Sequence, residues 1–297
     1  MKVVLVGIYY PVAILRYFER ALRRRSDIEL FTVGPHTGAQ IPWNGGMFLK
    51  PEYALPIPDM VLPVDARVTT AFVEMQLPWR PDVWLHINST WGLIGKPKCG
   101  KNLVVGVDPH CIGYDEARRH ADQFFCMQTP YMKDGDIWLP FAYDVECHSP
   151  VQGVTVEYDA GLVGAPYESR VRLAGELTRR GYKVLFTGYG PAYEEAQQLL
   201  AKCLIGLNWS TQLDLCARVF EVMAMGLCPV VNRVPDLAKM SFVEGVHYLG
   251  FSSVEEACDQ VANAITTCSI SSIALAAKEV VAPHTWDARI AELLSYV

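Results

Sequence analysis

The chain has 297 residues, of which 51% are hydrophobic and 20% are charged, a composition typical of a folded globular protein and not of a disordered one. This length fits two domains of about 150 residues each. The net charge of −6 argues against a surface coated in positive charge for nucleic acid. Residues 151–297 carry most of the acidity, whereas the first half gathers positive charge locally, as at Arg23–Arg25.

The sequence contains no membrane span and no export signal that we can identify. No stretch approaches the roughly 18 uninterrupted apolar residues that a spanning helix needs. The apolar start is short and leads into arginines without a cleavage site, so we expect a buried strand there and a cytoplasmic protein. The nine cysteines include no Cys-x-x-Cys pair, and we expect them to be small core residues in a reducing compartment.

In the first half, apolar runs alternate with amphipathic segments, as in βα units around a parallel sheet. The pattern predicts strands at residues 2–6, 28–33, 82–87 and 102–107, with shorter apolar runs at 123–127 and 137–139. It predicts helices at 14–22, 66–75 and 114–121. Residues 34–63 read as one long loop, and residues 140–153, with their prolines and turn formers, read as a domain linker.

The alternation starts again in the second half. Strands are predicted at residues 160–163, 183–186, 204–208, 229–231 and 247–250. Helices are predicted at 168–179, 193–202, 215–225, 254–266, 271–280 and 285–296. Gly181 and Gly226 follow two of these helices, where a left-handed residue is favoured. Two α/β domains in series predict a cleft at the carboxyl ends of their strands, but many chemistries share such folds.

The most informative run is Arg218-Val-Phe-Glu221-Val-Met-Ala-Met-Gly226. On a helix, Arg218 and Glu221 lie on one face near the helix N-terminus. A helix N-terminus with an added arginine suits a diphosphate, and a carboxylate one turn further can accept hydrogen bonds from a ribose. The same spacing also fits an exposed ion pair within the helix, worth a few tenths of a kcal/mol. Spacing alone leaves both interpretations open.

Here the sequence resembles a family. Arg218-x-Phe-Glu221-x-x-Ala-x-Gly226, after Ile205-Gly-Leu-Asn208, is similar to the donor-domain signature of GT-B glycosyltransferases, most of all the CgeB-like and group 1 (GT4-like) proteins. Further matches follow the family's order: Asp159–Gly164 with Arg170, Gly188-Tyr-Gly-Pro191, His284-Thr-Trp286 with Arg289, Val107–His110 and Trp138–Asp144. The resemblance covers most of residues 100–297 and only weakly residues 1–99.

The resemblance implies an α/β protein of the GT-B fold, with two Rossmann-like domains that face a central cleft. The acceptor-binding domain would span residues 1–145 and the nucleotide-sugar domain residues 154–283, with residues 284–297 returning to the first domain as a helix. Such an enzyme moves a sugar from a nucleotide-diphosphate donor to a hydroxyl. It holds no permanent cofactor and needs no metal, because arginines neutralise the leaving group.

The resemblance also assigns the donor contacts. It places Glu221 on the donor ribose and Arg170 and Arg218 on the diphosphate, with Gly164 allowing close approach of the backbone. Asn208 would donate to a phosphate or sugar hydroxyl, or serve only as a strand-end turn residue. Gly188 and Gly226 complete the predicted donor site through the motifs quoted above.

In the first half, Asp108 and His110 follow a predicted strand and are the candidate catalytic residues. Either side chain can act as base on the acceptor, and His110 can instead contact a donor-sugar hydroxyl or be purely structural. Tyr9, Tyr10 and His86 lie at other strand ends and are candidate acceptor contacts.

Two departures from the family pattern concern the donor. Many retaining members carry a second glutamate eight residues before the first, and here that position is Leu213, beside Asp214. The segment between Pro191 and Leu204 is short for gripping a base. We expect a UDP-sugar, with thymine or guanine nucleotides as the other possibilities.

The acceptor and the reaction leave several alternatives. The acceptor can be a hydroxymethylated DNA base, a cell-surface glycan, a protein or a small metabolite. DNA draws some support from the basic clusters of the first half. Alternative functions are an epimerase or hydrolase of nucleotide sugars and a non-catalytic nucleotide-sugar-binding protein. Stereochemistry and oligomeric state are not readable from the sequence.

Overall fold

The computed structural model of the chain describes residues 1–42, 46–88, 93–210 and 212–297, so that positions 43–45 of the predicted loop lie outside the described residues. The chain divides into two compact units. Unit 1 comprises Met1–Pro140 and Trp286–Val297, and unit 2 comprises Phe141–Thr285. The chain therefore leaves unit 1 once and returns to it with its last helix.

Unit 1 is built on a parallel seven-stranded sheet in the order β3-β2-β1-β5-β7-β8-β9. Its strands are β1 (Lys2–Val6), β2 (Glu29–Gly34), β3 (Met60–Val61), β5 (Val83–Ile87), β7 (Lys101–Gly106), β8 (Gln123–Cys126) and β9 (Ile137–Trp138). Strands β4 (Val68–Thr69) and β6 (Leu93–Ile94) form a separate two-stranded parallel sheet. The central strands are almost fully buried, as expected for a parallel sheet covered on both faces.

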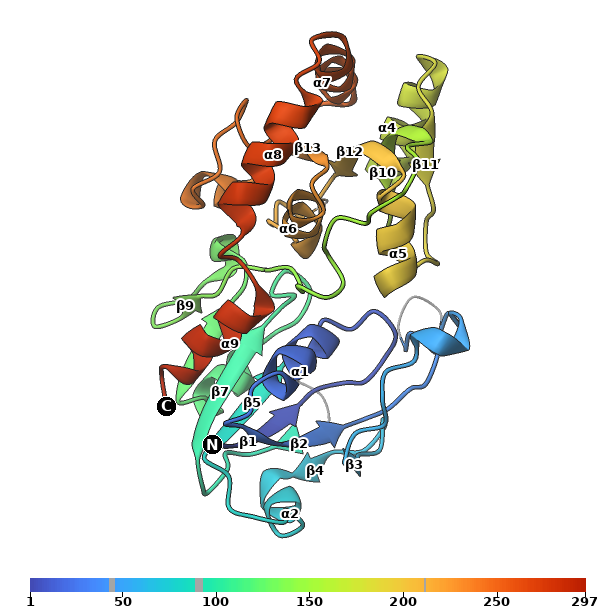
Figure 1. Ribbon diagram of the computed structural model, residues 1–297. Coiled ribbons are helices and arrows are strands. Elements are labelled where there is room, and N and C mark those ends of the chain that lie inside the picture. The colour runs from blue at the N-terminus through green and yellow to red at the C-terminus, as the bar shows by residue number, and fades with distance from the viewer. Residues whose placement is uncertain (43–45, 89–92, 211) are drawn as a thin grey trace. The chain divides into compact units, whose positions relative to one another are not determined.

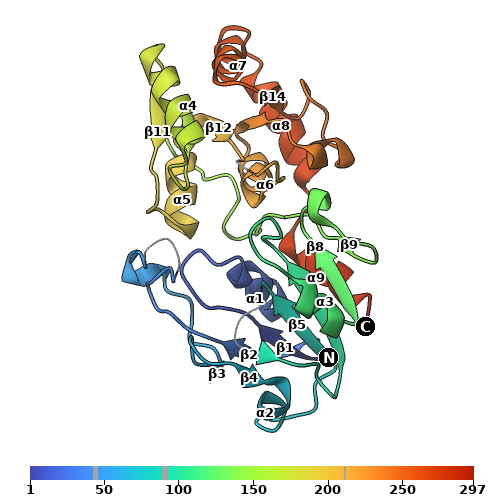
Figure 2. The ribbon, with the colours of Figure 1, turned by 180° about the vertical axis from the view of Figure 1, so that it is seen from behind.

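Helices cover both faces of this sheet (Figures 1 and 2). They are α1 (Leu15–Arg23), α2 (Thr70–Glu74), α3 (Asp115–His120) and α9 (Trp286–Leu294), with short 3-10 turns η1 (Pro51–Tyr53) and η2 (Thr129–Tyr131). Helices α1 and α9 pack together, with the Trp286 ring 4.8 Å from Phe18 and Arg24 paired to Asp287 at 2.7 Å. Because Trp286 is fully buried, the last helix completes the core of unit 1.

Unit 2 has a parallel five-stranded sheet in the order β11-β10-β12-β13-β14. Its strands are β10 (Tyr158–Leu162), β11 (Val184–Phe186), β12 (Cys203–Asn208), β13 (Cys228–Asn232) and β14 (Leu249–Phe251). Its helices are α4 (Glu168–Arg179), α5 (Tyr193–Leu200), α6 (Ala217–Ala224), α7 (Val254–Thr266) and α8 (Ile270–Val281), with one 3-10 turn, η3 (Pro235–Lys239).

Two apolar clusters hold these layers together. One joins α4 and α7 to the sheet through residues such as Leu173, Ile205 and Val261. The other includes Leu200 of α5 and Val222 of α6 on the opposite face. Among the described residues no single helix is long and apolar enough to cross a membrane; α7 and α8 meet that measure only together, across a bend of 108°.

The main departures from the predicted elements lie in the first half. The helix predicted at 66–75 is a short strand followed by the single-turn helix α2, because the Thr69 hydroxyl accepts a hydrogen bond from the Phe72 amide and starts the helix there. The predicted loop 34–63 contains the edge strand β3 and the turn η1. In unit 2 the predicted helices at 168–179 and 254–266 have those bounds in the structure.

Candidate functional site

In unit 2 the predicted donor residues gather where the strand order reverses. Strand β10 is flanked by β11 on one side and by β12 on the other, and ligands of parallel α/β sheets bind outside the carboxyl ends of such strands. Gly164 follows β10 and Asn208 ends β12. The two residues therefore lie at the same edge of the sheet.

Gly164 has a φ of +147°, and a Cβ added there would lie 3.2 Å from Nη1 of Arg170. The Arg170 guanidinium spans two loops, since Nε donates to the Trp209 carbonyl at 2.9 Å and Nη1 to the Ala165 carbonyl at 3.2 Å. Burial lowers the pKa of Arg170, and the nearby charge of Arg218 acts in the same direction. The structure thus holds two cations close together at this edge.

Helix α6 begins at the same edge. Its N-cap, Cys216, makes no side-chain capping bond, and the first turn contains no acidic residue. The Cys216 thiol instead donates to Oδ1 of Asn208 at 3.2 Å, which ties the start of α6 to the end of β12, and burial raises the pKa of this thiol to about 11. A positive residue, Arg218, occupies the first turn, where the helix dipole disfavours a cation.

Glu221 lies one turn further along α6 and is buried, with 9% of its surface exposed. Its Oε2 is 3.1 Å from Nε of Arg218, within ion-pair distance. The Nε–H of Arg218 has, within the described part of the chain, no hydrogen-bond partner of good geometry, so the pair is an electrostatic contact only. Neither side chain projects from an exposed face as an ordinary surface ion pair would.

A histidine that sequence reasoning missed reaches Glu221. Nε2 of His148 lies 3.6 Å from Oε1 of Glu221, and the His148 side chain is 7% exposed. His148 falls in the segment predicted to be only a linker, and its sequence neighbours carry no helical or strand period that would single it out.

A turn sets the orientation of His148. Oδ1 of Asp144 accepts hydrogen bonds from the amides of Glu146 and Cys147, and the Asp144 amide donates to Nδ1 of His148 at 3.1 Å. Because Nδ1 accepts, the proton of the neutral ring is on Nε2, the nitrogen that faces Glu221. Glu221 therefore has a donor on one side and a guanidinium on the other.

Two of the predicted donor glycines have different surroundings. Gly188 follows β11 in the left-handed region, with φ +63° and open space around its Cα. Gly226, with φ +75°, lies two residues beyond the end of α6. Its amide bonds to the Met223 carbonyl, which is a helix-ending role at the end of α6 opposite Arg218. We therefore remove Gly226 from the candidate donor site.

Asp214 lies beside Leu213, the position where many family members carry a second glutamate, and it forms hydrogen bonds within the loop before α6. Asp214 accepts a hydrogen bond from the Ser210 hydroxyl, and Ser210 is anchored to β13 by its amide, which donates to Oδ1 of Asn232 at 2.7 Å. Leu213 has φ +55° and is 58% exposed. Asp214 is thus part of the loop's own hydrogen bonding.

In unit 1 the candidate catalytic residues follow β7. Oδ2 of Asp108 accepts from the Asn88 amide at 3.0 Å, and Asn88 also accepts from the buried Tyr114 hydroxyl. Asn88 follows β5 with φ +51°, a left-handed conformation that asparagine tolerates. These contacts give Asp108 a fixed position between two strand ends.

His110 lies two residues beyond Asp108 and is half-buried. Its Nδ1 is 3.2 Å from Oε1 of Gln128, and its ring is 6.1 Å from that of Tyr131. Gln128 follows β8, the neighbour of β7 in the sheet, and is fully buried. Sequence reasoning missed Gln128 and Asn88, because neither belongs to a motif.

The three predicted acceptor contacts differ in exposure. Tyr9 is fully buried and burial raises its pKa, so its side chain has no surface to offer a ligand, and we remove it from the candidates. Tyr10 is partly exposed. His86 is 7% exposed and lines a pocket of about 190 Å³ on the face of the sheet covered by α3.

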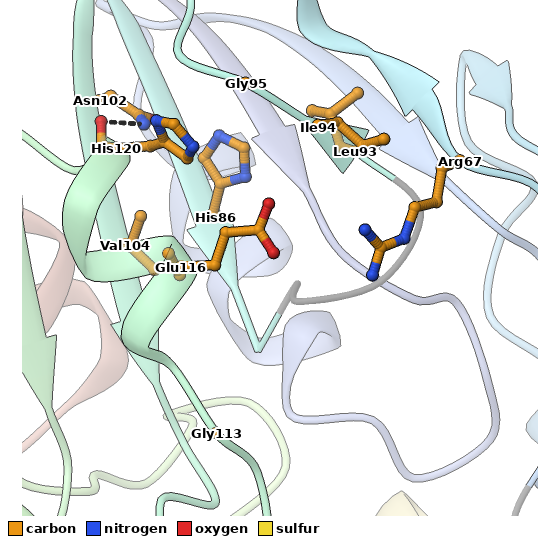
Figure 3. A pocket seen from close by; sticks show the side chains of 11 residues that line it. Arg67, His86, Leu93, Ile94, Gly95, Asn102, Val104, Gly113, Glu116 and His120 are labelled. Carbon is orange, nitrogen blue, oxygen red and sulfur yellow. Dashed lines mark hydrogen bonds between the residues drawn. The ribbon is translucent and has the colours of Figure 1, made fainter.

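Figure 3 shows this pocket, with His86, Asn102 and His120 along one side and Arg67 on the other. The Asn102 amide donates to the His120 carbonyl at 2.9 Å. Burial lowers the pKa of His86 to about 4, while its contact with Asn102 acts in the opposite direction. His86 is therefore neutral near pH 7.

The comparisons with known proteins bear on both units. Residues 160–295 match the family described as "Glycosyl transferase-like". The whole chain superimposes on solved structures at low sequence identity. A glycosyltransferase from Rickettsia africae gives a TM-score of 0.68 at 9% identity, covering 99% of this chain and 97% of its own. The family match covers less than half of the chain, and the solved structures show that the chain has the GT-B fold.

Two further structures of this fold cover the whole chain. Sucrose-phosphate synthase from Thermosynechococcus elongatus has a TM-score of 0.61 at 10% identity, with 98% of its own chain covered. HepE of Anabaena, in complex with UDP-glucose, has a TM-score of 0.59 at 14% identity, with all of its chain covered. A search of curated proteins finds no match.

These findings confirm the predicted fold class and the resemblance to GT-B glycosyltransferases. The family match in residues 160–295 is that of a transferase. Membership of the CgeB-like group stays a prediction, as do the roles of the individual site residues.

Proposed function

We propose that the chain transfers a sugar from a nucleotide-diphosphate donor, most readily a UDP-sugar, to a hydroxyl group without a metal ion. One observation carries this proposal: Arg170 and Arg218 lie near each other at the N-terminus of α6, with the buried Glu221 one turn further on. Such an arrangement suits a diphosphate followed by a ribose.

Electrostatics explains why a diphosphate suits this edge. Two like charges repel, burial disfavours the charge of Arg170, and a cation in the first helical turn opposes the dipole by about 0.3–1 kcal/mol. A bound diphosphate offsets these costs, since it receives bidentate contacts from guanidinium groups and hydrogen bonds from helix N–H groups. Because Gly164 has no side chain, its backbone comes close to Nη1 of Arg170, and phosphate oxygens can approach both groups.

Glu221 is the proposed contact of the donor ribose. A carboxylate accepts hydrogen bonds from both hydroxyls of a diol, which matches the role that the family resemblance implies. Its buried position between Arg218 and His148 limits its rotamers and keeps the carboxylate oriented before the donor arrives. The side-chain oxygen of Asn208 accepts from Cys216 and so positions the start of α6, while its NH2 group is the proposed donor to a phosphate or sugar hydroxyl.

The chemical step joins the acceptor oxygen to the anomeric carbon of the sugar as the bond to the diphosphate oxygen breaks. The nucleoside diphosphate leaves with the bonding electron pair, and Arg170 and Arg218 stabilise its charge in place of a metal. The acceptor proton passes to a base. We assign this role to His110, with Asp108, which is held in place by Asn88, as the alternative base.

A UDP-sugar is the proposed donor because HepE, which has the same fold, was crystallised with UDP-glucose. Tyr10 and the pocket around His86 stay the proposed acceptor region. A hydroxymethylated DNA base gains no support from the basic clusters, because several of their side chains form ion pairs within the protein. The pairs are Arg23–Glu19, Arg24–Asp287, Arg25–Asp27, Lys96–Asp122 and Arg118–Asp136. Cytoplasmic location likewise stays a prediction.

The test is binding and turnover with EDTA present. We expect UDP and UDP-sugars to raise the melting temperature of the wild-type protein by mass action, and GDP and TDP to raise it less. Glu221→Gln should retain the fold and lose most of this shift. The matched control is Glu176→Gln, which changes a partly exposed residue of α4 that pairs with Arg179 and should keep the shift. No shift with any nucleotide, or a strict metal requirement, would refute the proposal.

Transfer must also be separated from hydrolysis and epimerisation, which would use the same donor site. Mass spectrometry of the reaction products does so directly. Transfer gives nucleoside diphosphate only when an acceptor is supplied, hydrolysis gives it with water alone, and epimerisation gives none. For a DNA acceptor, binding must weaken steeply as salt rises; an affinity that does not change would exclude it.

A further inference from the structure

We propose that Gln128 is a positioning residue that holds His110 in the tautomer with its proton on Nδ1, so that Nε2 presents a lone pair to a substrate hydroxyl. This inference rests on the proposed function, which places His110 against the substrate. Its structural part, the tautomer, can be tested without any turnover.

The orientation of the Gln128 amide is determined by its surroundings. Its Nε2 donates to the Val107 carbonyl at 3.2 Å. A backbone carbonyl only accepts, so the nitrogen and not the oxygen of the amide must face it. The oxygen, Oε1, then faces Nδ1 of His110 at 3.2 Å.

The tautomer of His110 follows from that orientation. An amide oxygen accepts only, so Nδ1 must carry the proton in order to make this bond. A neutral imidazole has a single N–H, and Nε2 is consequently the acceptor. The amide oxygen accepts from the Nδ1–H both before and after Nε2 takes a proton, so no partner has to move during the reaction.

Gln128 is well placed to act as a rigid support. It is fully buried at the carboxyl end of β8, and its backbone carbonyl accepts from the Tyr131 amide at 3.1 Å and from the Cys126 thiol at 3.2 Å. Strand β8 pairs with β7, and Cys126 of β8 lies opposite Gly106 of β7. The side chain therefore connects two neighbouring strand ends, from one of which His110 projects.

A partner of this kind acts through another residue. Without it the ring populates both tautomers and rotates, and in the wrong tautomer Nε2 donates where it should accept. At metal sites, loss of the partner that orients a histidine costs about 10–100-fold in activity. We expect a loss at the lower end of that range in kcat, with little change in the KM for the donor.

The experiment uses long-range ¹H–¹⁵N NMR of the full-length protein at alkaline pH. The chain has seven histidines, and comparison with His110→Gln identifies the His110 signals. We expect wild-type His110 to have a protonated Nδ1 and a bare Nε2. In Gln128→Leu we expect a shift toward the Nε2–H form. Gln123→Leu changes a partly exposed glutamine at the other end of β8 and should leave His110 unchanged.

The outcomes separate the two proposals. A wild-type His110 protonated on Nε2 overturns the inference, whatever the enzyme does. A tautomer that is unaffected in Gln128→Leu also overturns it. If the spectra show the expected tautomers in both proteins and donor turnover falls about tenfold in Gln128→Leu, the inference holds. If the spectra agree but the wild-type protein transfers no sugar with any donor, the proposed function fails while the tautomer assignment stands.

Discussion

His86 should make the stability of unit 1 depend on pH, and the variant that tests this is His86→Gln. The ring is buried on the face of the sheet, where its pKa is lowered from 6.5 to about 4 by desolvation. Glutamine keeps a polar side chain in the pocket but does not titrate between pH 4 and pH 8.

The sign follows from comparing the folded and unfolded chains. Between pH 6.5 and pH 4 the unfolded chain binds a proton at His86 and the folded chain does not, so the free energy of unfolding falls as the pH falls. The full difference is about 3 kcal/mol, of which about 2 kcal/mol is lost between pH 7.5 and pH 5. Above about pH 7.5 the contribution is constant.

Urea unfolding at pH 7.5, 6 and 5, followed by tryptophan fluorescence, measures this dependence. We expect His86→Gln to be less stable than the wild type at pH 7.5 and to lose about 2 kcal/mol less on going to pH 5. His120→Gln, which changes another histidine of the same pocket, should keep the wild-type dependence. Equal dependence in wild type and His86→Gln would show that the buried ring ionises without penalty, which would contradict the reasoning.

Three further predictions concern the donor site and the last helix. Arg218→Ala should weaken UDP binding in calorimetry by about 10–100-fold, as expected from the loss of a charged hydrogen bond worth about 1.5–3 kcal/mol, whereas the exposed Arg179→Ala should not. Gly164→Ala should lower both the melting temperature and UDP affinity, because its Cβ would press on Arg170; Gly175→Ala, in open space on α4, should raise the melting temperature slightly. Trp286→Ala should lower the free energy of unfolding of unit 1 by about 3–5 kcal/mol in urea titrations, and an unchanged midpoint would contradict the assigned role of α9.

The regular elements of the chain were largely predictable because both sheets are parallel and buried. Strands such as β1 and β5 appear in the sequence as mostly apolar runs, and α4 and α7 carry a clear helical period between turn residues. The errors lie where tertiary contacts decide. The pair formed by β4 and β6 joins two-residue strands that are far apart in the sequence, and α2 starts at a threonine cap within a stretch that reads as one longer helix.

From spacing alone, the site was predictable only where residues of one helix carry it. Arg218 and Glu221 share α6, so their spacing shows that they face the same way. His148 approaches Glu221 from a segment more than seventy positions away, and Gln128 approaches His110 across two strands. Such contacts depend on sheet order and on a turn held by Asp144, and neither leaves a periodic signal in the sequence. Gly226 is an example of a further limit, because a helix-ending glycine and a phosphate-contacting glycine look the same within a motif.

The same structure shows why an ordinary ion pair is a poor explanation of the Arg218–Glu221 spacing. An exposed pair would place its N–H on the carboxylate, yet Nε of Arg218 is 3.1 Å from Oε2 without a hydrogen bond, and both groups are largely buried. A second guanidinium, Arg170, lies nearby, and the charge of Arg218 contributes to lowering the pKa of Arg170. The Glu221 carboxylate pairs with Arg218, while Arg170 and the free N–H groups at the start of α6 add further positive potential there. This excess of positive charge at the helix start is itself an argument for a diphosphate ligand.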